Sequence, residues 1–267
     1  MNKTVGFIGT GNMGGALAAA AAKALPGTQI VLYDKNMESA KQLAETTGCH
    51  YGSFALAASC DFIFLGVKPQ IIPQLMQDLK PALASRKDRF VLVSMAAGVS
   101  MERIQELAGR EYPVIRIMPN TPVAVGGGMI LYDSTEAVSC KELEEFRQIL
   151  SCAGRLDPLP EKLIDAGSAV SGCGPAFACL FIEALADGGV ACGLPRDKAL
   201  RYAQQMLLGT AQLALQTGQH PGQLKDAVCS PGGSTIAGVQ ALEEGAFRAA
   251  VISAVQKAFA RTVELGK

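Results

Sequence analysis

Apolar runs of two different spacings divide the first part of the chain into alternating elements. Short β-type runs fall at Thr4–Ile8, Gln29–Tyr33, Phe62–Gly66, Phe90–Ser94 and Val114–Ile117. Apolar residues at helical spacing lie between them, at Gly11–Ala24, Met37–Thr46, Pro69–Leu83 and Ser100–Ala108. Strands that alternate with helices predict a parallel sheet with helices on both faces. The segments Gly126–Leu131, Cys140–Leu150 and Gly154–Asp157 are predicted to add outer strands and a helix to that sheet.

The pattern changes after about Leu159, where β-branched clusters disappear and Ala- and Leu-rich stretches take over. Predicted helices follow at Leu163–Gly193, Arg196–Thr217, Pro221–Val228, Ser234–Glu243 and Ala246–Leu265. We therefore predict two domains, an α/β domain over residues 1–159 and an all-helical domain over residues 160–267. The first of these helices is weakly polar, and a domain of about 100 residues has little interior to bury it. We expect a homodimer, or a higher homo-oligomer built on dimers, to bury it.

A glycine-rich turn follows the first predicted strand and opens the first predicted helix. Gly9, Gly11 and Gly14 have the spacing of a dinucleotide-binding turn, and Asp34 closes the second strand about 20 residues later. In such a turn the first glycine allows the tight bend, the second lets a pyrophosphate approach, and the third lets helix pack on strand. The sequence therefore predicts a Rossmann-type, doubly wound dinucleotide-binding domain. The candidate coenzyme residues in this turn are Gly9, Thr10, Gly11, Asn12, Met13 and Gly14.

The residues after the second strand bear on the choice of coenzyme. Asp34 favours NAD, because a carboxylate accepts hydrogen bonds from ribose hydroxyls and repels a 2′-phosphate. Lys35 and Asn36 follow at once, and turned outward they would cradle that phosphate. A solvated Lys35 and an Asn36 that only caps the next helix are the structural alternatives. The three residues leave both coenzymes open, and we take NADP(H) as the preferred coenzyme with NAD(H) as the alternative.

Further candidate coenzyme residues lie where later strands end, because open α/β sheets bind ligands at the carboxyl ends of their strands. One loop contributes Gly66, Val67, Lys68 and Pro69, and the next contributes Met95, Ala96 and Ala97. Asn120 lies between two prolines that rigidify a loop suited to form a wall against the nicotinamide. A surface lysine at position 68 and a plain rigid turn around Asn120 are the alternatives. Ser53 completes the set of candidates.

A second glycine-rich stretch, Pro231–Gly238, is suited to hold a small carboxylate. Its two successive glycines let the backbone fold close to a ligand, and Ser234 and Thr235 are good capping residues for the apolar run that follows. Free N–H groups are expected to point outward there and bind an anion. The candidate substrate residues are Ser230, Gly232, Gly233, Ser234 and Thr235. With the nucleotide turn, this stretch predicts a reductase that acts on a small acid.

Composition and charge narrow the class of protein. Lys plus Arg and Asp plus Glu number 24 each, so no net field attracts nucleic acid or an anionic membrane. The eight cysteines contain no C-x-x-C pair and the two histidines are far apart, so we expect no metal site, reduced thiols and a cytoplasmic location. Uncharged runs at Thr4–Ala22 and Ala166–Ile182 are interrupted by glycines, so we predict no membrane segment.

Together these motifs resemble the pyrroline-5-carboxylate reductases over essentially the whole chain. The resemblance rests on Gly9–Gly14, Val67–Pro69, Met118–Pro122, Ser171–Phe177 and above all Ser230–Thr235. It implies reduction of 1-pyrroline-5-carboxylate to L-proline with NAD(P)H, the last step of proline biosynthesis. It also implies a Rossmann domain, a helical dimerisation domain, and an active site at the dimer interface where the substrate carboxylate meets the Gly-Gly-Ser-Thr loop. The family varies between serine- and alanine-sized residues where Cys173 and Ser234 stand.

The reaction chemistry agrees with that resemblance. A cyclic imine arrives protonated near neutral pH, whereas a carbonyl develops alkoxide and needs a His, Lys or Tyr acid nearby. No lysine lies between Lys162 and Lys198, where the similar 3-hydroxyacid dehydrogenases carry their catalytic lysine. We expect Thr235 to hydrogen-bond the ring nitrogen or a proton-supplying water, the alternative being a simple helix cap. A 3-hydroxyacid dehydrogenase and a sensor that binds NADP(H) without turnover are the rival functions.

Overall fold

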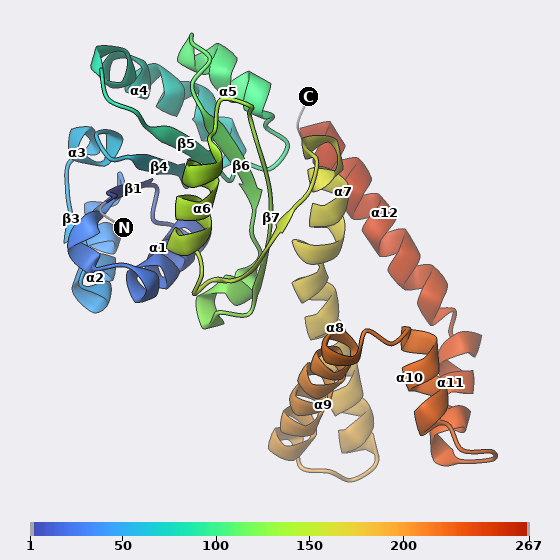
Figure 1. Cartoon of the computed structure of the whole chain (residues 1–267). Helices are drawn as coiled ribbons and strands as arrows, with labels where there is room; N and C mark the ends of the chain where they lie inside the picture. The colour runs from blue at the N-terminus through green and yellow to red at the C-terminus, as the bar shows by residue number, and fades with distance from the viewer. Residues whose placement is uncertain (1–2, 266–267) are drawn as a thin grey trace. The chain divides into compact units, whose positions relative to one another are not determined.

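Residues 3–265 are described by a computed structural model, in which eight strands form one sheet in the order β3-β2-β1-β4-β5-β6-β7-β8 (Figure 1). The strands are β1 (Val5–Ile8), β2 (Ile30–Tyr33), β3 (His50–Tyr51), β4 (Phe62–Leu65), β5 (Val91–Ser94), β6 (Val114–Met118), β7 (Gly128–Ser134) and β8 (Gly154–Pro158). The first six are parallel, and their order reverses between β1 and β4. That reversal opens a crevice at the carboxyl ends of these strands, where such sheets bind ligands.

Strand β7 departs from the parallel sheet that the sequence pattern predicts, because it runs antiparallel to β6. Only residues 119–127 join the two strands, and a parallel crossover needs a dozen or more residues. Strand β8 returns parallel to β7 after helix α6. The predicted outer strands and helix are therefore present, with the direction of the pairing changed by a short connection.

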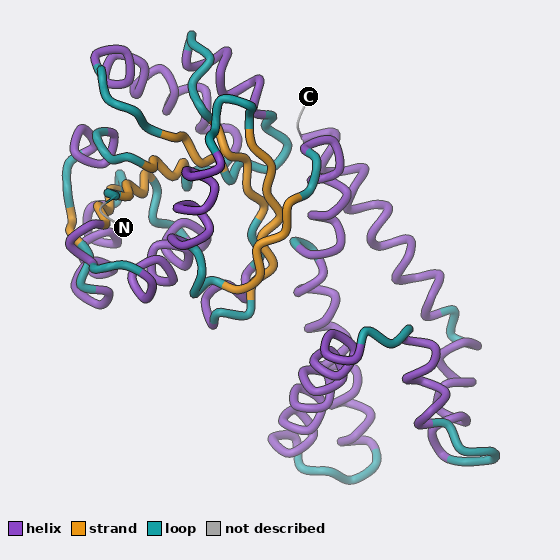
Figure 2. The backbone as a smooth tube through the Cα atoms, viewed as in Figure 1, coloured by secondary structure: helices purple, strands orange, loops and turns teal. Residues whose placement is uncertain are grey.

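The helices separate the strands and then fill the remainder of the chain (Figure 2). They are α1 (Asn12–Ala24), α2 (Met37–Thr47), α3 (Phe54–Ala58), α4 (Ile72–Ser85), α5 (Met101–Ala108), α6 (Cys140–Ile149), α7 (Glu161–Ser171), α8 (Gly174–Ala191), α9 (Arg196–Thr217), α10 (Pro221–Val228), α11 (Ser234–Glu244) and α12 (Phe247–Leu265). Short 3-10 turns are η1 (Gly27–Gln29), η2 (Pro69–Ile71) and η3 (Thr121–Val125). The sequence pattern missed two elements, β3 and α3, both too short to show a period.

Two apolar cores confirm the prediction of helices on both faces of the sheet. One core combines Phe7 and Phe64, whose rings stack with centroids 4.5 Å apart, with Leu17 of α1 and Phe146 of α6. The other core combines the alternate residues of the same strands with α3, α4 and α5. Since successive side chains of a strand point to opposite faces, a strand that is apolar throughout is buried on both sides. The α/β fold with a helical C-terminal part is thus established.

The single helix predicted over Leu163–Gly193 is two helices in the structure. Helix α7 ends at Ser171, and Ser168 O accepts hydrogen bonds from both Gly172 N (2.7 Å) and Cys173 N (3.0 Å). Pro175 explains the break, because a proline has no N–H and its ring clashes with the carbonyl four residues earlier, here that of Ser171. The carbonyl of Ser171 is therefore left free for another donor.

The chain divides into two compact units, Met1–Cys173 with Ala258–Lys267, and Gly174–Lys257. The boundary at residues 159 and 160 stays a prediction. By length and composition the stretch Glu161–Ala191 could cross a membrane, and 11% of its most apolar window is buried. The turn at Gly172 interrupts that stretch, and the absence of a membrane segment also stays a prediction.

A half-buried ion pair stabilises the first unit in a pH-dependent way. Arg89 donates to both carboxylate oxygens of Glu142 (2.7 and 2.9 Å), and Ser139 N donates to the same carboxylate (2.8 Å) in a capping box. These hydrogen bonds, Arg89 first, lower the pKa of Glu142 to about 2. A carboxyl group whose pKa is lower in the folded than in the unfolded protein stabilises the fold at pH values above its unfolded-state pKa. That stabilisation is lost as the pH falls through the unfolded-state pKa toward the folded-state pKa.

Glu142→Gln should therefore lower the free energy of unfolding near neutral pH by about 1–2 kcal/mol, a figure reduced because Arg89 is half exposed. Urea unfolding at pH 7 and again at about pH 3 measures the difference, which should shrink at the lower pH. Glu144→Gln, on the same helix and 69% exposed, is the matched control and should change little. An equal loss of unfolding free energy in the two variants would contradict a stabilising role for the Arg89–Glu142 ion pair.

Candidate active site

The glycine-rich turn after β1 has three glycines with different reasons to be glycine. Gly9 has a φ of 97°, which L-residues rarely adopt, and a Cβ on Gly14 would lie 2.1 Å from Gly9 O. A Cβ on Gly11, by contrast, would meet nothing within 4 Å. The backbone itself requires Gly9 and Gly14, whereas Gly11 faces open space at the start of α1. No side chain caps that helix, so its first N–H groups are available to an anion.

Asp34 closes the turn against the end of β2. Its carboxylate accepts hydrogen bonds from Thr10 N (2.7 Å) on one oxygen and from Asn36 N (2.8 Å) on the other. Asn36 in turn accepts from Ser39 N and caps α2, as the structural alternative for it predicts. Lys35 is exposed and makes no hydrogen bond or ion pair with any part of residues 3–265. Asp34 thus already serves two backbone donors, while the neighbouring lysine is free.

A hollow of about 620 Å³ lies beside this turn, which is within the size range of small-molecule sites, and most of its lining is apolar. Candidate residues Gly9, Asp34, Lys35, Gly66, Val67 and Lys68 line it. Sequence reasoning missed its remaining lining, which is Ile8, Tyr33, Phe54, Ile71, Leu75 and Asp78. Ile71 and Leu75 are four residues apart and follow Lys68, so helical spacing after the loop would have found them.

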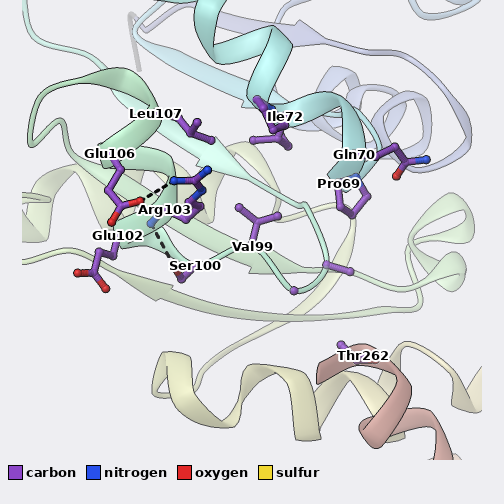
Figure 3. A pocket seen from close by; sticks show the side chains of 13 residues that line it. Pro69, Gln70, Ile72, Val99, Ser100, Glu102, Arg103, Glu106, Leu107 and Thr262 are labelled. Carbon is purple, nitrogen blue, oxygen red and sulfur yellow. Dashed lines mark hydrogen bonds and ion pairs between the residues drawn. The ribbon is translucent and has the colours of Figure 1, made fainter. Parts of the chain in front are cut away.

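A second hollow of about 850 Å³ is lined by residues that follow β4 and β5 (Figure 3). Candidate residues Pro69 and Ala97 line it, so the loop that supplies Lys68 borders the first hollow and its continuation borders the second. Arg103 and Glu106 point toward each other at its rim, with Arg103 Nη1 2.7 Å from Glu106 Oε2. A third, smaller hollow of about 350 Å³ is lined by Thr10, Gly11 and Asn12 together with α2. The three hollows are thus lined by coenzyme candidates that follow β1, β2, β4 and β5.

Four other candidates contribute to this region mainly through packing or capping. Met13 and Met95 are partly buried against one core of the sheet, and Ala96 is 1% exposed within the other. Ser53 Oγ accepts from Leu56 N (3.2 Å) and caps α3. A direct contact between these side chains and a coenzyme stays a prediction.

Asn120 is buried and has both ends of its amide engaged. Its Oδ1 accepts from Met129 N and its Nδ2 donates to Ser171 O, each at 2.9 Å. Ser171 O is the carbonyl that Pro175 leaves without a helical donor. The amide therefore ties the loop after β6 to the end of α7.

The loop before α11 has the uncapped backbone N–H groups that the sequence predicts, but a different residue occupies the N-cap position. Gly232 has a φ of 67°, and Gly233 N donates to Ser230 O (3.0 Å) in a tight turn. Gly233 is the N-cap residue of α11 and no side chain caps the helix, so the prediction that Ser234 and Thr235 cap it is wrong. Both residues instead begin the helix, where backbone N–H groups have no helical acceptor.

The hydroxyl of Thr235 is exposed and has no hydrogen-bond partner among the described residues. The loop belongs to the second compact unit, whereas the coenzyme candidates belong to the first. His50 is exposed on the edge strand β3, and His220 Nδ1 accepts from Gly222 N (3.1 Å) as the cap of α10. Within residues 3–265 no three His, Cys, Asp or Glu side chains are grouped to hold a metal ion.

Comparison with known proteins identifies both parts of the chain. Residues 161–265 match the family of pyrroline-5-carboxylate reductase dimerisation domains, and residues 4–98 match the family of coenzyme F420-dependent NADP oxidoreductases. The pyrroline-5-carboxylate reductase of Escherichia coli K12 is 39% identical over 100% of both chains. That of Synechocystis is 46% identical over 78% of this chain and 76% of its own.

A solved structure extends the comparison to the fold. The crystal structure of the Plasmodium falciparum pyrroline carboxylate reductase with NADP bound is 33% identical. It superposes with a TM-score of 0.89 and covers 100% of this chain and 99% of its own.

Proposed function

The chain belongs to the pyrroline-5-carboxylate reductase family, and from that membership we propose that it reduces 1-pyrroline-5-carboxylate to L-proline with NAD(P)H, the last step of proline biosynthesis. The observation that carries the proposal is the loop before α11, where uncapped amides adjoin the free hydroxyl of Thr235. Chiral chromatography after incubation with the imine and NADPH tests it. L-proline should accumulate. If protein that binds NADPH forms no L-proline, the proposal is contradicted.

The glycine-rich edge fits a nicotinamide dinucleotide. Open space in front of Gly11 and the uncapped start of α1 suit the pyrophosphate, and the hollow between Asp34 and Leu75 suits the adenosine. A bound NAD(P)H would supply the hydride for the imine carbon. The residues of this edge would hold the dinucleotide and exclude water from its reactive end.

The loop before α11 suits the substrate. Free N–H groups at the start of this 11-residue helix would hold the carboxylate, helped by the positive end of the helix dipole. The Thr235 hydroxyl would then hydrogen-bond the ring nitrogen or a water that supplies its proton. Because the imine carries its proton near neutral pH, positioning provides most of the catalysis and no strong acid is needed.

The arrangement around Asp34 supports NADP(H) as the preferred coenzyme. Its two oxygens already accept backbone N–H groups, which lessens their capacity to select ribose hydroxyls. The free Lys35 beside it supplies the positive charge that a 2′-phosphate requires.

Lys35→Ala should lower kcat/KM with NADPH about tenfold, the effect of one charge-assisted hydrogen bond, and change kcat/KM with NADH little. Steady-state rates with each coenzyme give the ratio of kcat/KM with NADPH to kcat/KM with NADH. Lys23→Ala, an exposed lysine at the far end of α1, is the control and should leave the ratio unchanged. Equal losses with both coenzymes would remove Lys35 from the discrimination.

A homodimer is the assembly that the second unit supports. Only Ala186 of the 18 residues of α8 is buried, although this helix is strongly apolar. Large apolar side chains are exposed on every long helix of the unit, such as Leu180 (66%), Leu215 (75%) and Ile252 (58%). Apolar surface of this extent marks a protein interface, and a second copy covers it most simply.

The eight cysteines are all unpaired, which supports a cytoplasmic location.

A further inference from the structure

A polar cluster joins α7 to the middle of the sheet. Arg116 of β6 has a side chain that is 4% exposed, and its Nη2 lies 2.5 Å from Asp165 Oδ1 of α7. Its Nη1 lies 3.4 Å from Glu161 Oε1, at the start of the same helix. Asp133, opposite Arg116 in the β6–β7 register, accepts from Glu161 N (2.6 Å). A buried guanidinium with carboxylate partners holds a fixed geometry, because breaking the pair would leave a buried charge uncompensated.

Glu161 also reaches a second element. Its Oε1 accepts from Met101 N at 2.7 Å, the first N–H of α5. The Ser100 side chain caps α5 by accepting from Arg103 N, and it does not accept from Met101 N. Glu161 is the acceptor for that first N–H group. An acidic side chain at a helix N-terminus is further stabilised by the helix dipole. One carboxylate therefore joins α7 to the residue that directly follows the segment Ser94–Ser100, which contains the candidate coenzyme residues Met95, Ala96 and Ala97.

Two more contacts relate α7 to the candidate coenzyme residues. Ala97 packs against a small buried cluster of Met118, Leu131 and Ile164, the last of which is on α7. At the other end of α7, Ser171 O accepts from Asn120. Both candidate loops, the one after β5 and the one after β6, are thus held by the same helix.

We propose that α7 positions the coenzyme-lining loops and that Glu161 is the positioning residue for the loop Ser94–Ser100. The inference rests on the proposed function only in taking that loop as a wall of the coenzyme site. It assigns to α7 a task besides assembly, although the dimerisation family match begins at residue 161. Glu161 acts through Met101 and does not touch the coenzyme.

The test compares three variants by NADPH titration and by hydrogen exchange of residues 94–101. Glu161→Ala removes the acceptor, and we expect the Kd for NADPH to rise about tenfold and amide exchange in the loop to accelerate. Glu161→Gln keeps an oxygen that can accept from Met101 N, and its Kd should stay within about twofold of wild type. Lys162→Ala, the exposed neighbour on α7, is the matched control.

The outcomes separate this inference from the proposed function. If wild type binds NADPH and Glu161→Ala binds it equally well with only a lower Tm, Glu161 is a structural cap and the inference fails. An equal loss in Glu161→Gln and Glu161→Ala would contradict the hydrogen bond to Met101 as the cause. If Glu161→Ala does not fold, Glu161→Asp replaces it, since it keeps the charge but its shorter side chain cannot reach Met101 N. Failure of wild type to bind NADPH would instead overturn the proposed function.

Discussion

Gly11→Ala should raise the KM for NADPH by about 100-fold, because the new methyl group enters the space that a pyrophosphate needs and displaces the coenzyme. The fold should tolerate the change, since a Cβ at this position meets no atom within 4 Å. As an N-cap alanine it should lower Tm by no more than about 4 °C. Initial rates over a range of NADPH concentrations, with a thermal melt of the same sample, measure both effects.

Gly14→Ala is the informative comparison for that variant. Its Cβ would lie 2.1 Å from Gly9 O, so backbone must move and the protein itself should be destabilised. The pair therefore separates a glycine required by the ligand from one required by the fold. Gly11→Ala with an unchanged KM for NADPH would show that no pyrophosphate lies against this turn.

Thr235→Ala should lower kcat/KM for the imine by about 10- to 100-fold, the loss of one hydrogen bond to a group that is charged in the reaction. Binding of NADPH should not change, and Thr235→Ser, which restores a hydroxyl, should recover much of the rate. The helix should persist, because Gly233 is the N-cap residue of α11 and no side chain caps it. Steady-state kinetics with the imine varied at saturating NADPH gives the effect.

Thr28→Ala is the control for that variant, since Thr28 is exposed in η1, before β2, and lines none of the three hollows described above. It should retain wild-type kinetics. A Thr235→Ala enzyme with wild-type turnover and substrate affinity would exclude the hydroxyl from the chemistry and leave the backbone amides as the only substrate contacts proposed for this loop.

Much of the fold could be predicted because its signals are local. The glycine spacing after β1, the apolar strands and the helical spacing of Arg196–Thr217 and Pro221–Val228 all lie within short windows, and the structure confirms these helices to the residue. Antiparallel β7 depended on the length of a connection, and the break between α7 and α8 depended on Pro175, whose effect a helical period does not reveal.

In the candidate site too, the features with local signals could be predicted and those that depend on distant residues could not. Gly11 and Gly14 could be assigned from their spacing, but their different environments arise only in the folded chain. Asn120 was predicted from its loop, while its bond to Ser171 depends on a partner 51 residues away. Glu161 gave no sequence signal, because its contact with Met101 spans 60 residues. Contacts between distant segments depend on how the sheet brings them together, which local patterns cannot specify.

Oxidation of NADPH in the presence of 1-pyrroline-5-carboxylate tests the proposed reaction most directly. Purified protein should consume NADPH rapidly with the imine, more slowly with NADH, and negligibly with a small oxo acid in place of the imine. Protein that binds NADPH but oxidises it with the oxo acid, or with neither compound, would contradict imine reduction and favour a hydroxyacid dehydrogenase or a coenzyme sensor.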